Sequence, residues 1–383
     1  MTMAPPARPP PEELVTVIIT TSPTPSAPST ELLEQIAASF RKHCASLIHC
    51  RVIVVLDTYD HVSKKPRLKK GHVTPDSAAK YADYKANAKR LILKEYSPTG
   101  RAYGAGDLVK TQEKAEFGSG AAAYASQDNA VVMNITTTKD KRVTFVEPLQ
   151  RLGFGLAVRS ALRMTVTPYV WIQQHDWALV TDIPLGPLLQ IMQEHKGSTG
   201  ATAEEEQDKK MNNEALPEAI RPPVEYVCFP SIRMMEYATS DHVMLYPALR
   251  ALTQLHKQNF TVQSEAADGV TVTSRVPLTP LFLWHDKPHL ASTSHYLNQV
   301  FYSRIAIQRG AFIEDTVGHL ARDEMKQGNW KKWACWLYYP DEGKHLCLRH
   351  LKGRTWRGVE AELAAKLEYM RLNGLDVNVQ VPN

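Results

Sequence analysis

Acidic side chains stand at three places where apolar segments end. Asp57 follows the run RVIVVL, Asp176 follows YVWIQQH, and the pair Glu314-Asp315 follows GAFI. Carboxylates can ligate a hard divalent cation through oxygen, and they can take a proton from an attacking hydroxyl. Each position also has a structural interpretation. A strand-terminal aspartate can form a turn, His175-Asp176 can be a hydrogen-bonded pair, and Glu314-Asp315 can cap a helix.

A basic segment near the C-terminus complements these acids. The sequence CLRHLKGRTW places His350, Lys352 and Arg354 close together. An imidazole can join oxygen ligands around a manganese ion, and the two cations suit a diphosphate. His319 and His345 are the alternatives to His350 as a metal ligand.

The local pattern predicts the elements that must position these residues. The β-branched runs VTVIIT and RVIVVL predict two buried parallel strands, joined by a helix with apolar residues at three- and four-residue steps from Leu32 to Phe40. A second helix over 152–164 leads into a strand over 169–174. Because the carboxyl ends of parallel strands meet at one edge of the sheet, we expect the strand-terminal acids to share a site.

The rest of the chain is organised around this unit. We predict an α/β protein with a mostly parallel, Rossmann-like sheet flanked by helices and a C-terminal extension. Residues 1–13 are Pro-rich and predicted to be disordered, 14–182 and 183–383 form two halves of one domain, and 195–222 form a mobile loop. Residues 97–142 are ambiguous. Other predicted elements are a loop over 61–75, helices over 78–96 and near 358–373, and short strands or helices at 226–229, 243–254, 281–284, 292–307 and 334–339.

The order of these features resembles the family-2-like glycosyltransferases of the GT-A fold. The shared features are the first strand and polar turn, the strand ending in Asp57, the helix with glycine and arginine, the strand leading to Gln174-His175-Asp176, and the later Glu314-Asp315. They cover residues 14–180 and 310–356. The resemblance implies inverting transfer of a sugar from a nucleotide-sugar donor, with UDP-sugars favoured, to a hydroxyl of a glycan, protein or small molecule.

The resemblance also assigns roles to individual residues. Asp176 and His350 would hold Mn²⁺ or Mg²⁺, and Gln174 stands where the family has the first acid of Asp-x-Asp. The catalytic base would be Asp315, with Glu314 as second choice. Donor binding would fall to Thr20, Thr21, Asp57, Arg159, Gln174, His175, Lys352 and Arg354.

Aromatic and polar residues in the second half predict a surface for the acceptor, because aromatic rings stack on sugars. These residues are Trp284-His285-Asp286-Lys287-Pro288-His289 together with His295-Tyr296. The segment KQGNWKKW at 326–333 adds tryptophan and lysine that can hold either the acceptor or the donor. The three-residue spacing of Trp330, Trp333 and Trp336 also fits a partly buried helix face.

Composition narrows the class of protein. A net charge of +5 over 383 residues is modest, so we expect no nucleic-acid partner, and the basic run KKPRLKK at 64–70 is expected to be a solvated loop. The five cysteines have no C-x-x-C spacing, which favours free thiols. No stretch has the roughly 18 apolar residues that a membrane span needs. We expect a cytoplasmic protein, with a Golgi enzyme separated from its anchor as the alternative.

Two other functions compete with glycosyl transfer. A nucleotidyltransferase for sugar phosphates would share the architecture, but TTSPTPSAPST after the first strand lacks the glycine and basic residues of a phosphate loop. A non-catalytic module that binds a glycan or protein is favoured by the loss of the first acid at Gln174. Retention of Asp176, Glu314, Asp315 and His350 favours an enzyme.

Overall fold

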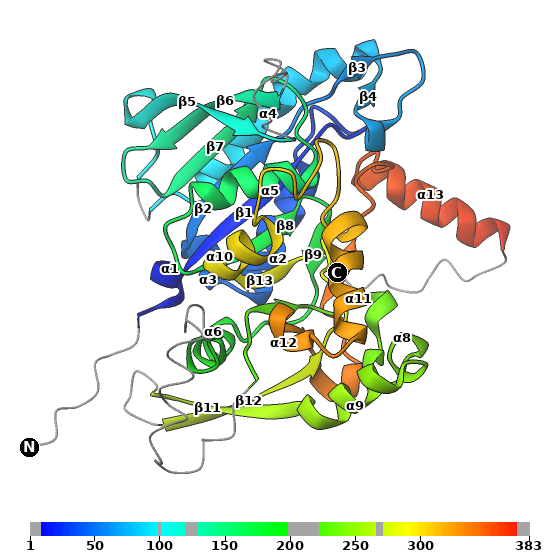
Figure 1. Ribbon diagram of the computed structural model, residues 1–383. Coiled ribbons are helices and arrows are strands. Elements are labelled where there is room, and N and C mark those ends of the chain that lie inside the picture. The colour runs from blue at the N-terminus through cyan, green and yellow to red at the C-terminus, as the bar shows by residue number, and fades with distance from the viewer. Residues whose placement is uncertain (1–8, 99–100, 119–128, 198–221, 266–270, 374–383) are drawn as a thin grey trace, which may run out of the picture.

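A computed structural model describes residues 9–98, 101–118, 129–197, 222–265 and 271–373 (Figure 1). Helices and strands are mixed along the chain. The strands are β1 Val15–Thr21, β2 Arg51–Leu56, β3 His61–Val62, β4 His72–Val73, β5 Leu108–Glu116, β6 Ala130–Thr138, β7 Val143–Pro148, β8 Tyr169–Gln174, β9 Trp177–Leu179, β10 Tyr226–Cys228, β11 Gln258–Glu265, β12 Thr271–Pro280, β13 His289–Ser292, β14 Cys335–Tyr338 and β15 Leu348–His350. The α-helices are α1 Pro11–Leu14, α2 Glu31–His43, α3 Ser46–His49, α4 Pro75–Glu95, α5 Phe154–Arg163, α6 Leu185–Glu194, α8 Asp241–Met244, α9 Pro247–His256, α10 Thr293–His295, α11 His319–Lys326, α12 Trp330–Trp333 and α13 Val359–Leu372.

The described strands form one large mixed sheet and two small ones. The order in the large sheet is β11-β12-β14-β10-β13-β8-β1-β2-β7-β6-β5. The neighbouring strands β8, β1, β2 and β7 run parallel to one another, and β10 runs parallel to β14. The outer pairs β5–β6 and β11–β12 are antiparallel, and so is β13 beside β8. The expectation of a mostly parallel sheet therefore holds only for its centre.

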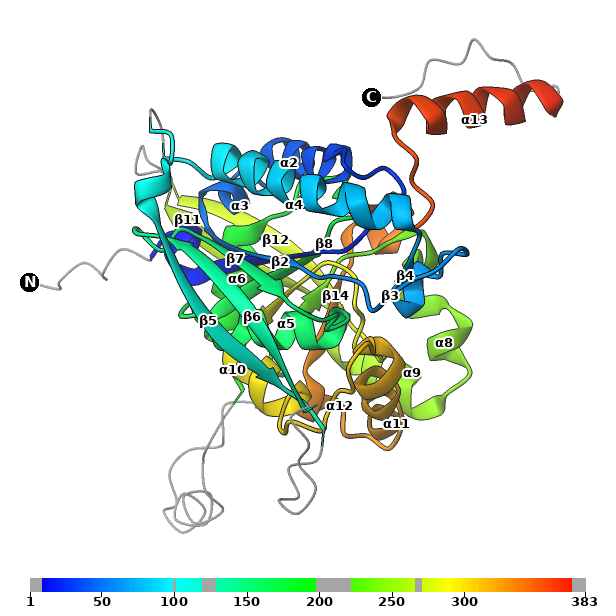
Figure 2. The ribbon, with the colours of Figure 1, turned by 90° about the horizontal axis from the view of Figure 1, so that it is seen from above.

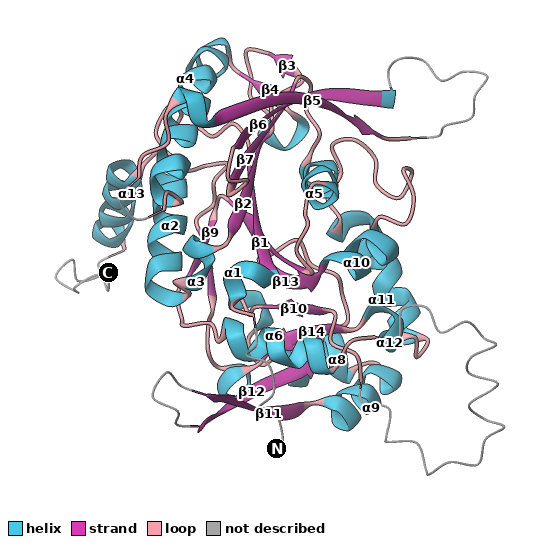
Figure 3. Ribbon diagram, turned by 90° about the vertical axis from the view of Figure 1, so that its left-hand side faces the viewer, coloured by secondary structure: helices cyan, strands magenta, loops and turns pink. Residues whose placement is uncertain are grey.

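The central strands are buried because helices cover both faces. All seven residues of β1 are buried, as the β-branched run predicts for a strand without a solvent face. Helices α2 and α4 lie on one side of the sheet and α5 on the other (Figures 2 and 3). The apolar face of α2, including Leu33, Ile36 and Phe40, joins the common core. No helix in the described parts of the chain is long and apolar enough to cross a membrane.

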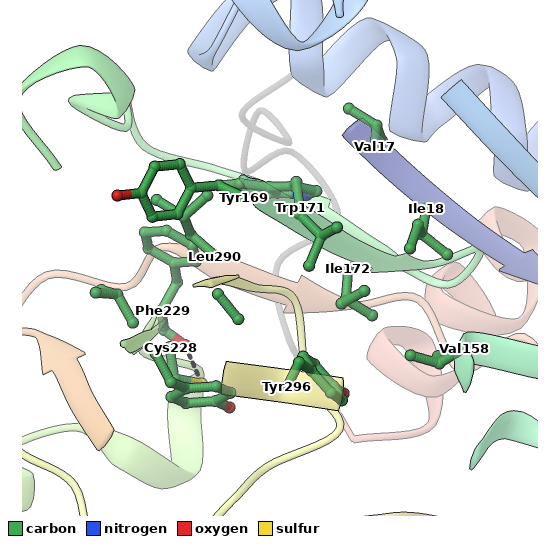
Figure 4. Packing of buried hydrophobic residues seen from close by; sticks show 14 of the residues in the cluster. Val17, Ile18, Val158, Tyr169, Trp171, Ile172, Cys228, Phe229, Leu290 and Tyr296 are labelled. Atoms are coloured by element: carbon green, nitrogen blue, oxygen red, sulfur yellow. Dashed lines mark hydrogen bonds between the residues drawn. The ribbon is translucent and has the colours of Figure 1, made fainter. Parts of the chain in front are cut away.

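Aromatic packing joins the two halves of the chain. Trp171 of β8 is fully buried, and its ring stacks on Phe229 at 4.8 Å between centroids. Phe40 of α2 meets the same indole edge-on at 6.3 Å. Figure 4 shows Trp171 beside Tyr169, Leu290 and Phe229. One tryptophan thus links α2, the central strand and the segment after β10, so the halves share one core.

The order of strands creates a topological switch point beside β1. The chain passes from β1 to β2 and β7 on one side, then crosses through α5 to β8 on the other side of β1. In open sheets of this kind, ligands bind outside the carboxyl ends of the strands at such a reversal. Thr20, Asp57 and Gln174 lie at or directly after the carboxyl ends of β1, β2 and β8.

Several predicted elements are confirmed. Helices α4, α5 and α13 and strand β8 occur where the apolar pattern placed them. The ambiguous segment 97–142 contains the antiparallel pair β5–β6. Leu281–Trp284, predicted as a short element, has no regular structure and follows β12.

The prediction of disorder over residues 1–13 is wrong for its last residues. Pro11–Leu14 forms the short helix α1, which starts with proline and carries Glu12 and Glu13 in its first turn, where both fit the helix dipole. Residues 1–8 lie outside the described part of the chain, as does nearly all of the predicted loop 195–222.

Replacement of Trp171 by alanine tests the shared core. Because the indole contacts both halves, we expect Trp171→Ala to lower the free energy of unfolding by about 3–5 kcal/mol. Val166 is 75% exposed, so Val166→Ala is the control and should change it by less than about 0.5 kcal/mol. Urea denaturation followed by circular dichroism measures both. A loss below about 1 kcal/mol for Trp171→Ala would show that the halves are held together elsewhere.

Candidate functional site

A cleft opens at the carboxyl ends of the parallel strands, and we call it the strand-edge cleft. Its walls come from the ends of β1, β2 and β8, the loop before β4, the start of α5 and the segment after β15. The lining residues are Thr20, Thr21, Ser22, Pro23, Asp57, Thr58, Tyr59, Leu68, Lys69, Gly71, Val73, Arg151, Gly153, Phe154, Ala157, Gln174, His175, Asp176, Phe312 and Arg354. The structure therefore brings Thr20, Thr21, Asp57 and Asp176 to one place, as the sequence predicted.

Asp57 holds the start of α5 against β2. Its Oδ1 accepts hydrogen bonds from the backbone N–H of Thr58 at 2.9 Å and of Leu152 at 2.8 Å, and Oδ2 accepts from Gly153 at 2.9 Å. Burial raises the pKa of Asp57 above its usual value, although these three donors act in the opposite direction. The carboxylate is thus partly engaged by the protein, and only its remaining acceptor capacity can face a ligand.

Gly153 is required by a close approach of two backbones. Its φ is +79°, and a Cβ placed there would lie 2.4 Å from the Cα of Gly310. Gly153 also lies between Asp57 and the segment that leads to Glu314. Gly153, the first glycine of the sequence Gly-Phe-Gly at the start of α5, therefore serves packing between two site-bearing segments.

Asp176 lies at the centre of a second set of contacts. Its Oδ2 accepts hydrogen bonds from Nε2 of His350 at 3.1 Å and from the backbone N–H of Gly353 at 3.0 Å. Burial raises the pKa of Asp176, but His350, His175 and the Gly353 N–H outweigh it and bring the pKa to about 2. Asp176 is therefore ionised at neutral pH. Its Oδ1 is buried and has no partner among the described residues.

His350 is positioned by a short antiparallel pair of strands. It lies opposite Trp177 in the β9–β15 pair, and the two rings stack at 4.5 Å between centroids. Gly353 allows the chain to cross close above the acid, since a Cβ there would lie 2.7 Å from Nε2 of His175 and 2.9 Å from Cβ of Asp176. The predicted association of His350 with Asp176 is thus present in the structure.

Asp176 and His350, the predicted metal ligands, form a pair that no third carboxylate, thiolate or imidazole ligand joins in the described part of the chain. No group of three or more His, Cys, Asp or Glu side chains with ligand geometry occurs in the described residues. Gln174, which replaces the first acid, donates through Nε2 to the carbonyl oxygen of Asp286 at 2.7 Å. His319 and His345 are exposed and line neither the strand-edge cleft nor the cavity described below.

Three cations, Lys69, Arg151 and Arg354, line the strand-edge cleft, and of these only Arg354 was predicted to lie there. Arg354 and Lys69 lie over Phe312, with Cζ and Nζ 5.4 Å and 5.7 Å from its ring centroid. Arg151 donates to the carbonyl oxygen of Lys69 at 3.0 Å. Sequence reasoning assigned Lys69 to a solvated basic loop and did not single out Arg151. The position of Arg151 directly before Leu152-Gly153 was the available signal.

Arg159 does not reach this cleft. Its guanidinium donates to the carbonyl oxygens of Glu116 at 3.0 Å and Arg304 at 3.3 Å, beneath α5. Burial lowers the pKa of Arg159 to about 10. The expectation that Arg159 lies near a diphosphate is wrong, because its position along α5 turns it toward β5 and β6 rather than toward the carboxyl ends.

Asp286 joins Glu314 in a pair of carboxyl groups with opposite pKa shifts. The Glu314 N–H donates to Oδ1 of Asp286 at 3.2 Å, and the Asp286 N–H donates to Oε2 of Glu314 at 3.3 Å. Burial and the charge of Glu314 raise the pKa of Asp286 well above its usual value. Burial also acts on Glu314, but His285, whose Nδ1 lies 3.1 Å away, and Lys287 lower the pKa of Glu314 to about 2. The two carboxyl groups therefore differ in proton affinity, and Asp286 binds a proton more readily than Glu314.

Glu314 and Asp315 border a small space that we call the junction. It adjoins the strand-edge cleft and is lined by Lys69, Gln174, Trp177, Asp286, Lys287, Phe312, Glu314, Asp315 and Arg354. The Asp315 side chain is 61% exposed, and its Oδ2 lies 3.9 Å from Nζ of Lys69. Both predicted base candidates thus face the same space, with Asp315 the more accessible.

A larger cavity of about 690 Å³ lies beyond the junction. Trp177, Lys287 and Glu314 border both spaces. Lys352 lines this cavity and not the strand-edge cleft, so the expectation that it faces the donor beside Arg354 is wrong. We call this space the basic cavity, and its walls are Trp177, Ser231, Ile232, Arg233, Met234, Tyr237, His242, Tyr246, Phe282, Leu283, His285, Lys287, Glu314, Arg322, Lys326, Leu346, Leu348, Arg349, His350 and Lys352.

Most of the aromatic residues predicted to face an acceptor belong to the core. Trp284, Trp330 and Trp333 are at most 1% exposed. His289 and His295 are also buried, and burial lowers the pKa of His289 to about 3 and that of His295 to about 4. Of the predicted clusters, His285, Lys287 and Lys326 do reach the basic cavity.

No protein-family model matches the sequence, and no significant relative is found among curated proteins.

The pKa of Asp176 leads to a prediction about acid stability. A carboxyl group with a folded pKa near 2 and an unfolded pKa near 3.8 stabilises the fold above pH 3.8, and this contribution disappears as the pH falls toward 2. At pH 7 we expect Asp176→Asn to lower the free energy of unfolding by about 2 kcal/mol. The deficit should shrink below about pH 4.

Urea unfolding of both proteins at several pH values measures this difference. Asp182, whose side chain is 87% exposed, provides the matched control, and Asp182→Asn should cost less than about 1 kcal/mol. A deficit for Asp176→Asn that stays constant down to pH 3 would contradict the assigned pKa.

Proposed function

We propose that the protein is a metal-dependent glycosyltransferase with a GT-A-like fold. The observation that carries this proposal is the meeting of three parallel strand ends, with Thr20, Asp57 and Asp176, in one cleft at the switch point of the sheet. This cleft continues through a carboxylate-lined junction into a second cavity. Two spaces that adjoin at a pair of acids suit a donor and an acceptor that react at their border.

The strand-edge cleft suits a nucleotide-sugar donor, with a UDP-sugar favoured. Thr20, Thr21 and Asp57 line this cleft and would contact the nucleoside, Asp57 through its free acceptor capacity. Lys69, Arg151 and Arg354 would face the two phosphates, because cations of this kind bind phosphate oxygens through charge-assisted hydrogen bonds. Pro23, Tyr59 and Phe154 supply apolar surface to the same cleft.

The residues present fit a divalent cation that is shared with the donor. Oδ1 of Asp176 is buried and has no partner among the described residues, and His350 adjoins the other oxygen. Mn²⁺ accepts this combination of oxygen and imidazole when phosphate oxygens complete its shell. The ion would supply charge neutralisation for the departing nucleoside diphosphate.

The acceptor hydroxyl needs a carboxylate to take its proton, and we assign this role to Asp315. A general base must be accessible and must not hold its charge too firmly. Glu314 is bound to the Asp286 N–H and has its pKa lowered to about 2, so it is a weaker base. Glu314 then acts as a positioning residue that orients the junction, with Asp286 as its hydrogen-bonded partner.

Nucleotide binding provides the first test. We expect UDP to raise the melting temperature only when Mn²⁺ is present, since the cation links the phosphates to Asp176. At a UDP concentration of 100 Kd the gain corresponds to about 2.7 kcal/mol. Asp176→Ala should abolish it and the exposed control Asp182→Ala should retain it. Stabilisation by UDP that is independent of Mn²⁺ would refute the metal-bridged donor.

Turnover provides the second test. Donor hydrolysis across UDP- and GDP-sugars, followed by nucleoside diphosphate release, identifies the donor. We expect Asp315→Asn to reduce acceptor-dependent turnover by at least about 100-fold while UDP–Mn²⁺ binding is unchanged. Glu314→Gln should retain more activity than Asp315→Asn, and Asp323→Asn, an exposed change on α11, should be fully active.

The outcome of these assays also separates the competing functions. Full activity of Asp315→Asn would move the base to Glu314. Release of pyrophosphate from a nucleoside triphosphate and a sugar phosphate would identify a nucleotidyltransferase. Binding of UDP and Mn²⁺ without turnover of any donor would favour a module that binds ligands without catalysis.

A further inference from the structure

The basic cavity is walled by elements that come together only in the fold. Helices α8, α9 and α11 are neighbours on the side of the molecule away from β5 and β6 (Figure 1). With the segment 231–234 and the β9–β15 pair, α8 and α11 enclose a space of about 690 Å³. Cavities of this size hold small molecules rather than an extended macromolecule.

Positive charge dominates the described residues that line this cavity. Glu314 is the acid among them, and its charge is already placed near His285 and Lys287. Histidines 242, 285 and 350 add further nitrogen donors. The cations are Arg233, Lys287, Arg322, Lys326, Arg349 and Lys352.

Several of these cations have no partner of opposite charge among the described residues. Arg233, Arg349 and Lys352 make no ion pair there, whereas Lys287 faces the charge of Glu314. Nε of Arg322 is buried without a hydrogen-bond partner, and the nearest carboxylate contact of this nitrogen, with Asp323, is a long 3.9 Å. The cavity therefore presents hydrogen-bond donors that the protein itself does not use.

Six cations around one small space repel one another, and this repulsion lowers stability unless an anion is bound. Charged groups on solvated surfaces usually alternate in sign, whereas here one sign lines a concave wall. A concave wall of one sign also focuses the field and raises the local concentration of the opposite ion. The arrangement is typical of a site for a multiply charged anion.

Apolar and aromatic residues indicate the body of the ligand. Tyr246, Phe282 and Trp177 contribute rings to the cavity, and Lys326 lies 4.0 Å from the centroid of the Tyr246 ring. Ring faces pack against the C–H faces of sugars and polyols, while arginine and lysine bind their phosphate or sulfate groups. A purely inorganic anion has no carbon skeleton that could pack against these rings.

We propose that the basic cavity binds a sugar or polyol that carries several phosphate or sulfate groups, and that this anion is the acceptor. The acceptor role rests on the glycosyl transfer proposed above. A free hydroxyl of the anion would reach Asp315 through the junction, and the hydroxyl oxygen would form the new glycosidic bond. The proton would pass to Asp315 and the nucleoside diphosphate would leave into the strand-edge cleft.

Sucrose octasulfate and neutral sucrose form a matched pair of probes with the same carbon skeleton. We expect isothermal titration calorimetry of the full chain, at about physiological salt, to detect binding of the octasulfate and none of sucrose. The octasulfate should bind equally in the presence of UDP and Mn²⁺, because it occupies a different space.

The double variant Arg233→Ala/Arg349→Ala tests the location. Both side chains are exposed, so the fold should be retained, and we expect octasulfate to bind at least about tenfold more weakly. Lys64→Ala/Lys65→Ala removes the same charge from an exposed loop outside the cavity and should leave affinity unchanged. Circular dichroism checks that both variants are folded.

Each remaining outcome decides a separate question. Equal loss in both double variants, or displacement of UDP by the octasulfate, would overturn the assignment of the anion to this cavity. If octasulfate binds as expected while UDP and Mn²⁺ do not, the cavity assignment stands and glycosyl transfer fails. If donors are hydrolysed but neutral and sulfated disaccharides bind alike, transfer stands and the anionic acceptor is wrong.

Discussion

The contact of the Asp176 carboxylate with His350 and Gly353 organises both spaces of the molecule. It ties the end of the central strand β8 to the C-terminal segment, and it places Arg354 on one side of the tie and Lys352 on the other. The carboxylate tolerates burial because two donors and nearby imidazoles stabilise its charge. A single acid thereby fixes where the strand-edge cleft ends and where the basic cavity begins.

The second acidic pair shows how environment separates two similar groups. Glu314 lies among His285, Lys287 and a backbone N–H and has its pKa lowered to about 2, whereas burial and the charge of Glu314 raise the pKa of Asp286. Opposite shifts of neighbouring carboxyl groups are a recurrent feature of catalytic sites. Glu314 and Asp286 also bind each other's backbone N–H. Among the described residues of the junction, the exposed Asp315 is the carboxylate without such a bond.

Two separate sets of cations would each face one anionic substrate of the proposed reaction. Lys69, Arg151 and Arg354 face the strand-edge cleft, and a larger set surrounds the basic cavity. A net charge of only +5 conceals this distribution, since acids elsewhere compensate for it. An enzyme that joins two anions needs such local fields, because their mutual repulsion would otherwise oppose a productive encounter.

The sequence by itself determined the central parallel strands, the helices between them and the meeting of Asp57 with Asp176, because these follow from apolar periodicity and from the geometry of parallel sheets. It also indicated His350 correctly as a neighbour of Asp176. Only the tertiary structure decided the direction of Arg159, the burial of Trp284 and Trp330, the role of Asp286 and the separation of Lys352 from Arg354. Those outcomes depend on which face of a helix or loop turns toward distant segments, and neither residue type nor spacing encodes that direction.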